Sequence, residues 1–269
     1  MRLSALAFAM SVLSGFPAQA GHYKDVEYAR AGEVNLRMDI QTADGQGLAP
    51  AVILVHGGGW IRGDRVWNVS PLFDPLHEAG YAWFSISYRP ATDFLNFGVA
   101  VEDVRAAIHY VRDNAARYGV DPDRIVVIGE SAGAHLASLA ALAEPKLLAG
   151  VVSLYGPMNL EHLARTSPVV PAQVRDALQN SAFGPLLSSH LQSLSPAARV
   201  VAGAPPFLLI HGTADGVVPL DQSTEMQKKL KAVGVVCDLI TVPGGGHGMR
   251  HWGRSPEQAA WKKQLVAWL

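Results

Sequence analysis

The sequence predicts an α/β protein in which one mostly parallel, twisted sheet of about eight strands is flanked by helices. Short apolar runs recur along the chain, and stretches with helical periodicity separate them. Parallel neighbours need long crossover connections, which helices usually provide, so this alternation favours a single sheet covered on both faces. The chain has 269 residues, of which 49% are hydrophobic, and this suffices for one large core.

The expected strands are of two kinds. Residues 23–29 and 34–40 alternate apolar and polar side chains, which predicts two antiparallel strands at a sheet edge. The later runs are apolar throughout, as in strands buried on both faces. These runs cover residues 51–55, 82–87, 124–128, 150–154, 207–210 and 235–242.

The clearest helix is expected over residues 97–118. Its apolar residues recur in steps of three and four, which forms one stripe facing the sheet. They are Phe97, Val101, Val104, Ile108, Val111 and Ala115. Asp-Pro-Asp-Arg at 121–124 predicts a turn before the next strand. Residues 157–204 are weakly patterned, and we expect a partly helical excursion that covers the functional site as a small lid.

The first twenty residues have the pattern of a secretory signal peptide. Arg2 supplies a positive charge, residues 3–16 are almost wholly apolar, and the sequence ends in the cleavage pattern Ala18-Gln19-Ala20. We therefore expect cleavage after about Ala20, a single domain over residues 21–269, and a secreted or periplasmic location. An N-terminal core strand or helix is the alternative. The apolar run is too short for a membrane span, and we expect no stable membrane insertion.

The net charge argues against nucleic acid as a partner, and the cysteine content excludes two kinds of cysteine site. The formal net charge is −1, so no basic surface is available for nucleic acid. A lone cysteine, Cys237, excludes an internal disulfide and a cysteine-based metal cluster. Composition leaves the oligomeric state open.

Residues 125–142, IVVIGESAGAHLASLAAL, place Gly-x-Ser-x-Gly between an apolar strand and an Ala-rich helix. In this context the tight turn forces Ser131 into strained backbone angles and presents its hydroxyl at the carboxyl edge of the sheet. The following N–H group, that of Ala132, lies at a helix N-terminus, where the dipole favours negative charge. The pattern predicts that Ser131 is a nucleophile. We expect Glu130 to be a structural hydrogen-bond partner.

A serine nucleophile needs a general base, and the base needs an orienting carboxylate. His247 lies in the glycine-rich loop that follows the last expected strand, and His251 is its only nearby rival. Asp215 follows a buried strand, whereas Asp221 is expected at a helix start and Asp238 within a strand. We therefore predict His247 as the base and Asp215 as its partner.

The stretch His56-Gly57-Gly58-Gly59-Trp60 follows the expected strand at 51–55. Three successive glycines expose backbone N–H groups that no side chain crowds, as the stabilisation of an oxyanion requires. We predict an oxyanion hole formed by the N–H groups of Gly58, Gly59 and Ala132, with His56 bracing the loop. Six further residues follow strand ends or motif loops and are candidates to line the substrate pocket: Trp60, Arg62, Tyr88, Tyr155, Met249 and Trp252.

These motifs resemble those of the α/β-hydrolase superfamily. HGGGW at 56–60, SYRPA at 87–91, GESAGAH at 129–135, HGTADGVVP at 211–219 and GHG at 246–248 are similar to motifs of hormone-sensitive-lipase-like esterases. They resemble more closely those of the compact secreted bacterial esterases grouped with feruloyl and acetyl-xylan esterases. The resemblance implies a serine carboxylesterase that needs no metal and no cofactor.

The lipase-like enzymes usually carry an N-terminal helical cap, whereas only strands are expected here before residue 51. We therefore expect a pocket that is open or covered only by residues 157–204. By analogy, the substrates would be small short-chain or aryl esters, including acetyl or feruloyl groups on plant polysaccharide. Two alternatives remain open: an amidase such as an aryl-formamidase, and a non-catalytic binding module.

Overall fold

The computed structural model describes residues 21–91 and 97–269. One eight-stranded sheet, in the order β1-β2-β4-β3-β5-β6-β7-β8, runs through the molecule. The first strand pairs antiparallel with the second, the second pairs antiparallel with β4, and the remaining neighbours are parallel. The predicted fold class and the antiparallel edge are therefore confirmed. The expected signal peptide lies outside the described residues.

The strands are β1 (His22–Ala31), β2 (Val34–Gln41), β3 (Ala49–Val55), β4 (Ala82–Ile86), β5 (Val120–Glu130), β6 (Gly150–Leu154), β7 (Phe207–Gly212) and β8 (Cys237–Val242). The α-helices are α1 (Phe73–Glu78), α2 (Gly98–Asp113), α3 (Ala115–Tyr118), α4 (Ala132–Ala143), α5 (Leu160–Thr166), α6 (Ala172–Asn180), α7 (Gly184–Ser193), α8 (Asp221–Ala232), α9 (Pro256–Ala259) and α10 (Trp261–Trp268). Short 3₁₀ turns are η1 (Ser70–Leu72), η2 (Pro196–Ala198) and η3 (Met249–His251).

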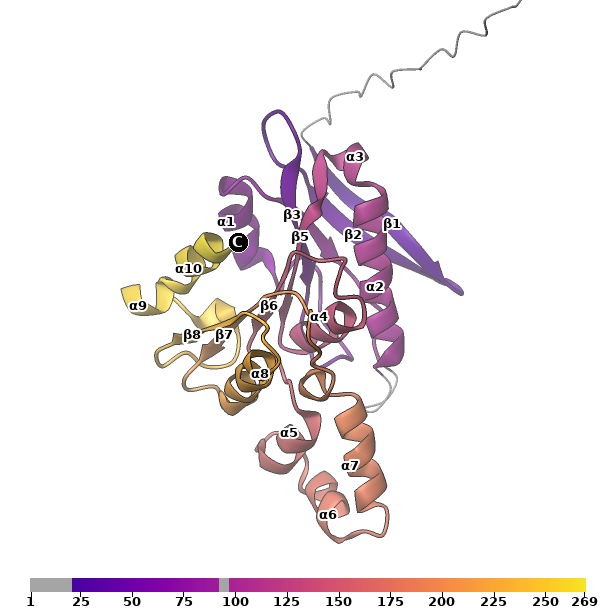
Figure 1. Ribbon diagram of the computed structural model, residues 1–269, viewed down its shortest axis with the longest axis vertical. Coiled ribbons are helices and arrows are strands. Elements are labelled where there is room, and N and C mark those ends of the chain that lie inside the picture. Colours follow the sequence, from indigo (N-terminus) through magenta and orange to yellow (C-terminus); the bar gives the residue numbers. More distant parts are fainter. Residues whose placement is uncertain (1–20, 92–96) are drawn as a thin grey trace, which may run out of the picture.

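Helices cover both faces of the sheet (Figure 1). Successive residues of β3 point to opposite faces. Ile53 packs into the cluster that includes the apolar stripe of α2 and the buried side of α4. Its neighbour Leu54 packs into the cluster that includes Leu76 of α1 and Leu265 of α10. Burial on both faces explains why the central strands are mostly apolar, with Ser85 and Ser153 as buried polar exceptions.

Two local predictions were wrong. The helix expected over 97–118 is divided into α2 and α3 at Asn114, whose backbone N–H and side-chain Nδ2 both donate to the Tyr110 carbonyl, at 3.0 and 2.9 Å. The turn expected at 121–124 lies inside β5. There the pairing changes from Ala49 opposite Val120 to Ala51 opposite Ile125, so residues 121–124 form a bulge.

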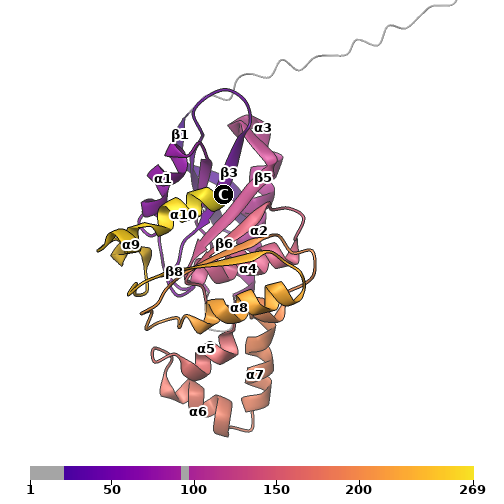
Figure 2. The ribbon, with the colours of Figure 1, turned by 60° about the vertical axis from the view of Figure 1, so that its left-hand side comes forward.

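The excursion between β6 and β7 contains α5, α6 and α7. These helices project beyond the carboxyl edge of the sheet (Figure 2). The loops that follow β3, β5, β6 and β7 meet at the same edge, because parallel strands share their direction. No helix within residues 21–91 or 97–269 is long and apolar enough to cross a bilayer.

Candidate active site

Ser131 lies in a strained turn between β5 and α4, with φ 51° and ψ −120°. A Cβ atom on Gly129 would lie 2.4 Å from the Gly133 carbonyl oxygen, and one on Gly133 would lie 2.2 Å from the Val55 carbonyl oxygen. Neither position tolerates a side chain without moving backbone. The two glycines therefore let α4 pass close to the strands, and this close packing holds the unfavourable angles of Ser131 in place.

Three side chains from distant loops form a hydrogen-bonded line. The Ser131 Oγ atom lies 2.9 Å from Nε2 of His247, although 116 positions separate the two residues. Nδ1 of His247 lies 2.8 Å from Oδ2 of Asp215. Because an ionised carboxylate only accepts hydrogen bonds, the proton sits on Nδ1 and leaves Nε2 free to accept from the serine. The arrangement can move a proton from Ser131 to His247.

The Asp215 carboxylate is held from several sides. Its Oδ1 atom accepts hydrogen bonds from the N–H groups of Val217 and Val218, both at 2.9 Å. Burial would raise the pKa of this carboxyl group, but interactions with His211 and His247 and the Val218 N–H group hold the pKa well below its usual range. His211 lies farther from this carboxylate than His247 does. Its Nε2 is 3.5 Å from Asp215 Oδ2 and 2.8 Å from the Val218 carbonyl oxygen.

The glycine loop after β3 has a conformation that favours glycine. The φ angle is 119° at Gly58 and 62° at Gly59, and a Cβ on Gly58 would lie 1.9 Å from the Arg62 carbonyl oxygen. The N–H group of Gly57 is occupied, because it donates to Glu130 Oε1 at 2.9 Å. Among the residues described, the N–H groups of Gly58, Gly59 and Ala132 donate to no protein acceptor. They are available for an oxyanion beside Ser131.

Glu130 joins three loops around this line. Its Oε1 atom accepts from the Gly57 N–H group and from Asn68 Nδ2 at 3.1 Å. Its Oε2 atom accepts from the Tyr155 hydroxyl at 2.6 Å. That hydroxyl in turn accepts from the Met249 N–H group at 3.0 Å. Glu130 is therefore saturated with structural hydrogen bonds, in agreement with the expectation from the sequence.

A cavity of about 400 Å³ opens at Ser131. Of the six candidate pocket residues, Arg62, Tyr155 and Met249 line this cavity. Tyr155 and Met249 form a buried wall with 0% and 2% exposure. The remaining lining residues are Gly58, Gly59, Trp67, Asn68, Glu130, Ser131, Val217, His247, Gly248, Arg250 and His251.

The other candidate pocket residues lie elsewhere. Tyr88 was expected to bind substrate. Instead its ring stacks on that of His56, with the ring centroids 4.4 Å apart, and its hydroxyl donates a hydrogen bond to the His56 carbonyl at 3.1 Å. Tyr88 therefore stabilises the start of the glycine loop. Trp252 packs edge-on against Tyr155 at 5.1 Å. Trp60 lines a different cavity. Because side-chain direction and not chain position decides what faces a pocket, these expectations needed correction.

The sequence reasoning also missed part of the rim. Trp67 is 63% exposed, and the Arg250 guanidinium lies 4.1 Å above its ring. Arg250 also donates to Ser70 Oγ at 2.7 Å. Trp67 lies in a stretch with no strand or helix period, so no pattern indicated it. Arg250 follows His247 so closely that its position alone was a usable signal.

Comparisons with known proteins show which family the chain resembles. The model of the BD-FAE family matches residues 38–230. The chain is 33% identical over 217 residues to Esterase LipC of Mycobacterium tuberculosis, with 74% of this chain and 53% of that protein covered. It is 29% identical over 270 residues to Isoprenylcysteine alpha-carbonyl methylesterase ICME of Arabidopsis thaliana, with 91% and 62% covered. The chain spans about half the length of the curated relatives it matches.

Solved structures share the whole fold. A truncated carbohydrate esterase from gut microbiota superposes with a TM-score of 0.76 at 26% identity, covering 93% of this chain and 95% of the other. A thermophilic esterase of Thermogutta terrifontis has a TM-score of 0.71 at 25% identity, covering 92% and 90%. With a family match that spans most of the sheet, the chain belongs to the BD-FAE family and has the α/β-hydrolase fold.

Proposed function

We propose that the protein is a carboxylic ester hydrolase that works through an acyl-enzyme on Ser131. The observation that carries the proposal is the line from Ser131 through His247 to Asp215, with hydrogen-bond lengths of 2.9 and 2.8 Å. It lies beside N–H groups that donate to no acceptor in the part of the chain that the structure describes. The names of the relatives support it, since LipC and the Thermogutta protein are both named esterases.

The reaction follows from these positions. Ser131 Oγ attacks the ester carbonyl while His247 Nε2 takes its proton. The carbonyl oxygen gains negative charge, which the N–H groups of Gly58, Gly59 and Ala132 stabilise. His247 then gives the proton to the leaving alkoxide, and Asp215 stabilises the imidazolium in between. A water molecule repeats the sequence and releases the acid.

Acetyl or feruloyl groups on plant polysaccharide belong to this proposal as candidate substrates. The exposed Trp67 ring on the rim supports a sugar-like alcohol, since aromatic rings offer an apolar face with little loss of side-chain entropy. A structural relative is described as a carbohydrate esterase. Acetylated xylan, methyl ferulate and p-nitrophenyl acetate should all be hydrolysed, and activity on p-nitrophenyl acetate alone would argue against a polysaccharide substrate.

Export through residues 1–20 is a further part of the proposal. It rests on the positive, apolar and Ala-x-Ala pattern of that segment. N-terminal sequencing of the protein from its native host should begin at about Gly21. Recovery of the chain with residues 2–20 intact would contradict the proposed cleavage.

Covalent labelling tests the nucleophile directly. The Thermogutta esterase has been solved in a form phosphonylated by sarin. A fluorophosphonate probe should label this protein on Ser131 alone, and Ser131→Ala should abolish the labelling. Buried Ser138, on the same helix as the nucleophile turn, gives the control Ser138→Ala, which should still be labelled. Absence of labelling would favour a binding module, and faster turnover of p-nitroacetanilide than of p-nitrophenyl acetate would favour an amidase.

A further inference from the structure

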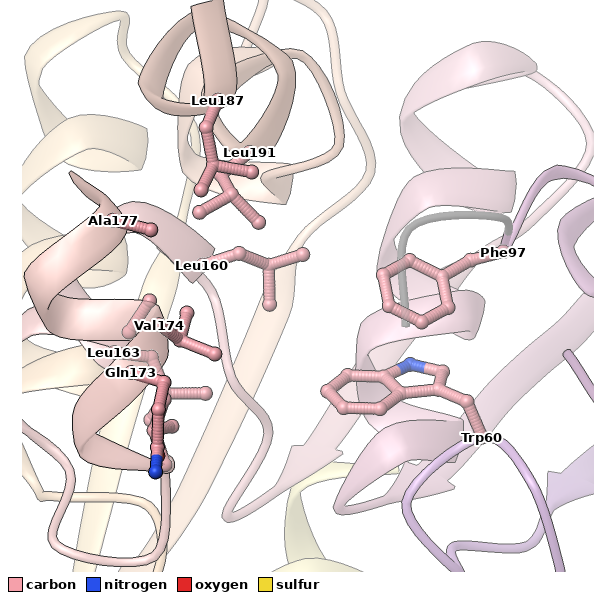
Figure 3. Close-up of a pocket in the computed structure, with 11 residues that line it drawn as sticks. Trp60, Phe97, Leu160, Leu163, Gln173, Val174, Ala177, Leu187 and Leu191 are labelled. Atoms are coloured by element: carbon pink, nitrogen blue, oxygen red, sulfur yellow. The ribbon is translucent and has the colours of Figure 1, made fainter. Parts of the chain in front are cut away.

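A second cavity of about 310 Å³ lies beside the one at Ser131, and its wall is almost wholly apolar. Leu160, Val174 and Leu191, from α5, α6 and α7, face the rings of Trp60 and Phe97 across it (Figure 3). Gln173 is the only residue of this wall with an amide, carboxylate or hydroxyl group. We call it the apolar cavity. Apolar cavities of this size take up apolar ligands more readily than water.

The Trp60 side chain, which forms one wall of the apolar cavity, is held by a hydrogen bond and by ring packing. Its indole Nε1 donates to Nδ1 of His135 at 3.1 Å, and its ring lies 4.6 Å from that of Phe97. Nε2 of His135 lies 2.8 Å from the carbonyl oxygen of Leu194, which caps α7. One buried histidine therefore ties the glycine loop to the helices of the excursion. The apolar cavity is preformed, as small-molecule sites usually are.

Two chain segments link the lining of the apolar cavity to that of the cavity at Ser131, which we call the reaction cavity. Gly59 lines the reaction cavity, and the next residue, Trp60, lines the apolar one. On the other side Val217 lines the reaction cavity, and its carbonyl oxygen accepts from Ser167 Oγ at 2.7 Å. Ser167 lies three positions before Val170, which lines the apolar cavity. The linings of the two cavities are therefore joined through neighbouring residues at the Gly58–Gly59 loop and at the Val217–Ser167 contact.

The position of the proton donor decides which cavity takes the alcohol part of the ester and which takes the acyl part. His247 has to protonate the leaving alcohol, so the alcohol lies on the His247 side. That side carries Arg250 and His251, and neither of them nor His247 lines the apolar cavity. The acyl group lies on the other side of the ester carbon, and the apolar cavity, which no residue of the His247 loop lines, is the one assigned to it.

We propose that the apolar cavity binds the acyl chain, and that the preferred ester carries an unbranched apolar acyl chain of medium length. This inference rests on the proposed ester hydrolase function. A volume of 310 Å³ holds on the order of ten groups of the size of a water or methylene, so chains of about six to ten carbons fit. Each methylene that leaves water should raise kcat/KM by up to about fourfold.

A series of p-nitrophenyl esters from acetate to dodecanoate provides the first test. The value of kcat/KM should rise from acetate to octanoate by at least about tenfold, because several methylenes leave water, and should fall once the chain exceeds the cavity. A maximum at acetate with a steady decline afterwards would overturn the inference while leaving the ester hydrolase intact.

Filling the cavity provides the second test. The Cβ atom of Ala177 in α6 points into it (Figure 3), so Ala177→Phe should lower the ratio of octanoate to acetate kcat/KM at least about tenfold. Gln179 lies on the exposed side of the same helix, and Gln179→Phe should keep the ratio of the unsubstituted protein. An unchanged ratio in Ala177→Phe would contradict the assignment.

Binding without catalysis separates the two proposals and does not depend on how Ala177→Phe folds. Octanoate titrated calorimetrically into the Ser131→Ala protein should bind, and acetate should not. If the unsubstituted protein hydrolysed no ester while Ser131→Ala bound octanoate, the proposed function would be refuted and the apolar site kept. Hydrolysis of acetate esters without octanoate binding would refute the apolar acyl site alone.

Discussion

The hydroxyl of Tyr155 donates a 2.6 Å hydrogen bond to Glu130, the residue next to Ser131. It also accepts from the N–H group of Met249, which follows the His247 loop. Burial beside Glu130 raises the pKa of the Tyr155 hydroxyl, so this group remains a donor at physiological pH. One side chain thereby fixes the serine turn and the histidine loop relative to each other.

Tyr155→Phe should weaken both the fold and the reaction. It leaves Glu130 Oε2 without its donor and the Met249 N–H group without its acceptor, and each buried unpaired group costs about 1–3 kcal/mol. Urea unfolding should show a loss of that order, and kcat for p-nitrophenyl acetate should fall. Tyr81, whose hydroxyl has no partner among the residues described, gives the control Tyr81→Phe, which should change neither. Equal behaviour of the two variants would refute the bridging role.

Gly133→Ala tests the close approach of α4 to β3. In an open helix this change would stabilise by about 1 kcal/mol through helix propensity. Here the new Cβ would lie 2.2 Å from the Val55 carbonyl oxygen, and both partners are backbone, so overpacking should outweigh propensity. We expect a net loss of about 1–3 kcal/mol in urea unfolding. Gly216→Ala, which meets open space, should be close to neutral, and a stabilised Gly133→Ala would contradict the packing argument.

Asp215→Asn should keep the fold but remove the charge that orients His247. We expect kcat for p-nitrophenyl acetate to fall by about 10⁴-fold, because an amide can favour the wrong imidazole tautomer. Since the folded-state pKa of Asp215 is depressed, its contribution to stability is fully present above about pH 4 and is lost as the pH falls further. Unfolding measured from pH 6 to pH 3 should show a steeper loss for the unsubstituted protein than for Asp215→Asn. Parallel curves would contradict this electrostatic role.

His135 should make stability depend on pH in a different range. Burial lowers its pKa to about 4. A histidine with a lowered folded-state pKa stabilises fully above its unfolded value of about 6.5, and that stability is lost as the pH falls toward 4. The free energy of unfolding should fall by about 3 kcal/mol over this range, because each unit of pKa difference between the unfolded and folded states contributes about 1.36 kcal/mol.

The control for His135 is His135→Gln, which can still accept from Trp60 and donate to the Leu194 carbonyl. Urea unfolding at pH 7 and pH 4.5 should show a smaller loss of stability for this variant than for the unsubstituted protein. An equal loss would show that His135 is not the titrating group.

The sequence predicted the residues whose positions the topology dictates. Ser131, Asp215 and His247 each follow a strand, and parallel strands deliver such loops to one edge of the sheet. Local context therefore sufficed for a contact across 116 positions. The position of the Gly58–Gly59 loop on the cavity at Ser131 was predictable for the same reason, because it follows a parallel strand beside β5.

The parts that escaped prediction depend on side-chain direction. Nothing local showed that Tyr155 would reach Glu130, or that Arg250 would lie over Trp67. Tyr88 follows a strand end as Tyr155 does, yet it packs behind the glycine loop. The break at Asn114 also had no signal in the apolar stripe, which continues across it to Ala115.

The most direct measurement is the steady-state hydrolysis of p-nitrophenyl acetate by the unsubstituted protein and by Ser131→Ala, with circular dichroism to show that both are folded. We expect turnover by the unsubstituted protein and a kcat lower by at least about 10⁴-fold in the variant. A folded Ser131→Ala that hydrolyses the ester as fast as the unsubstituted protein would contradict a mechanism built on this serine.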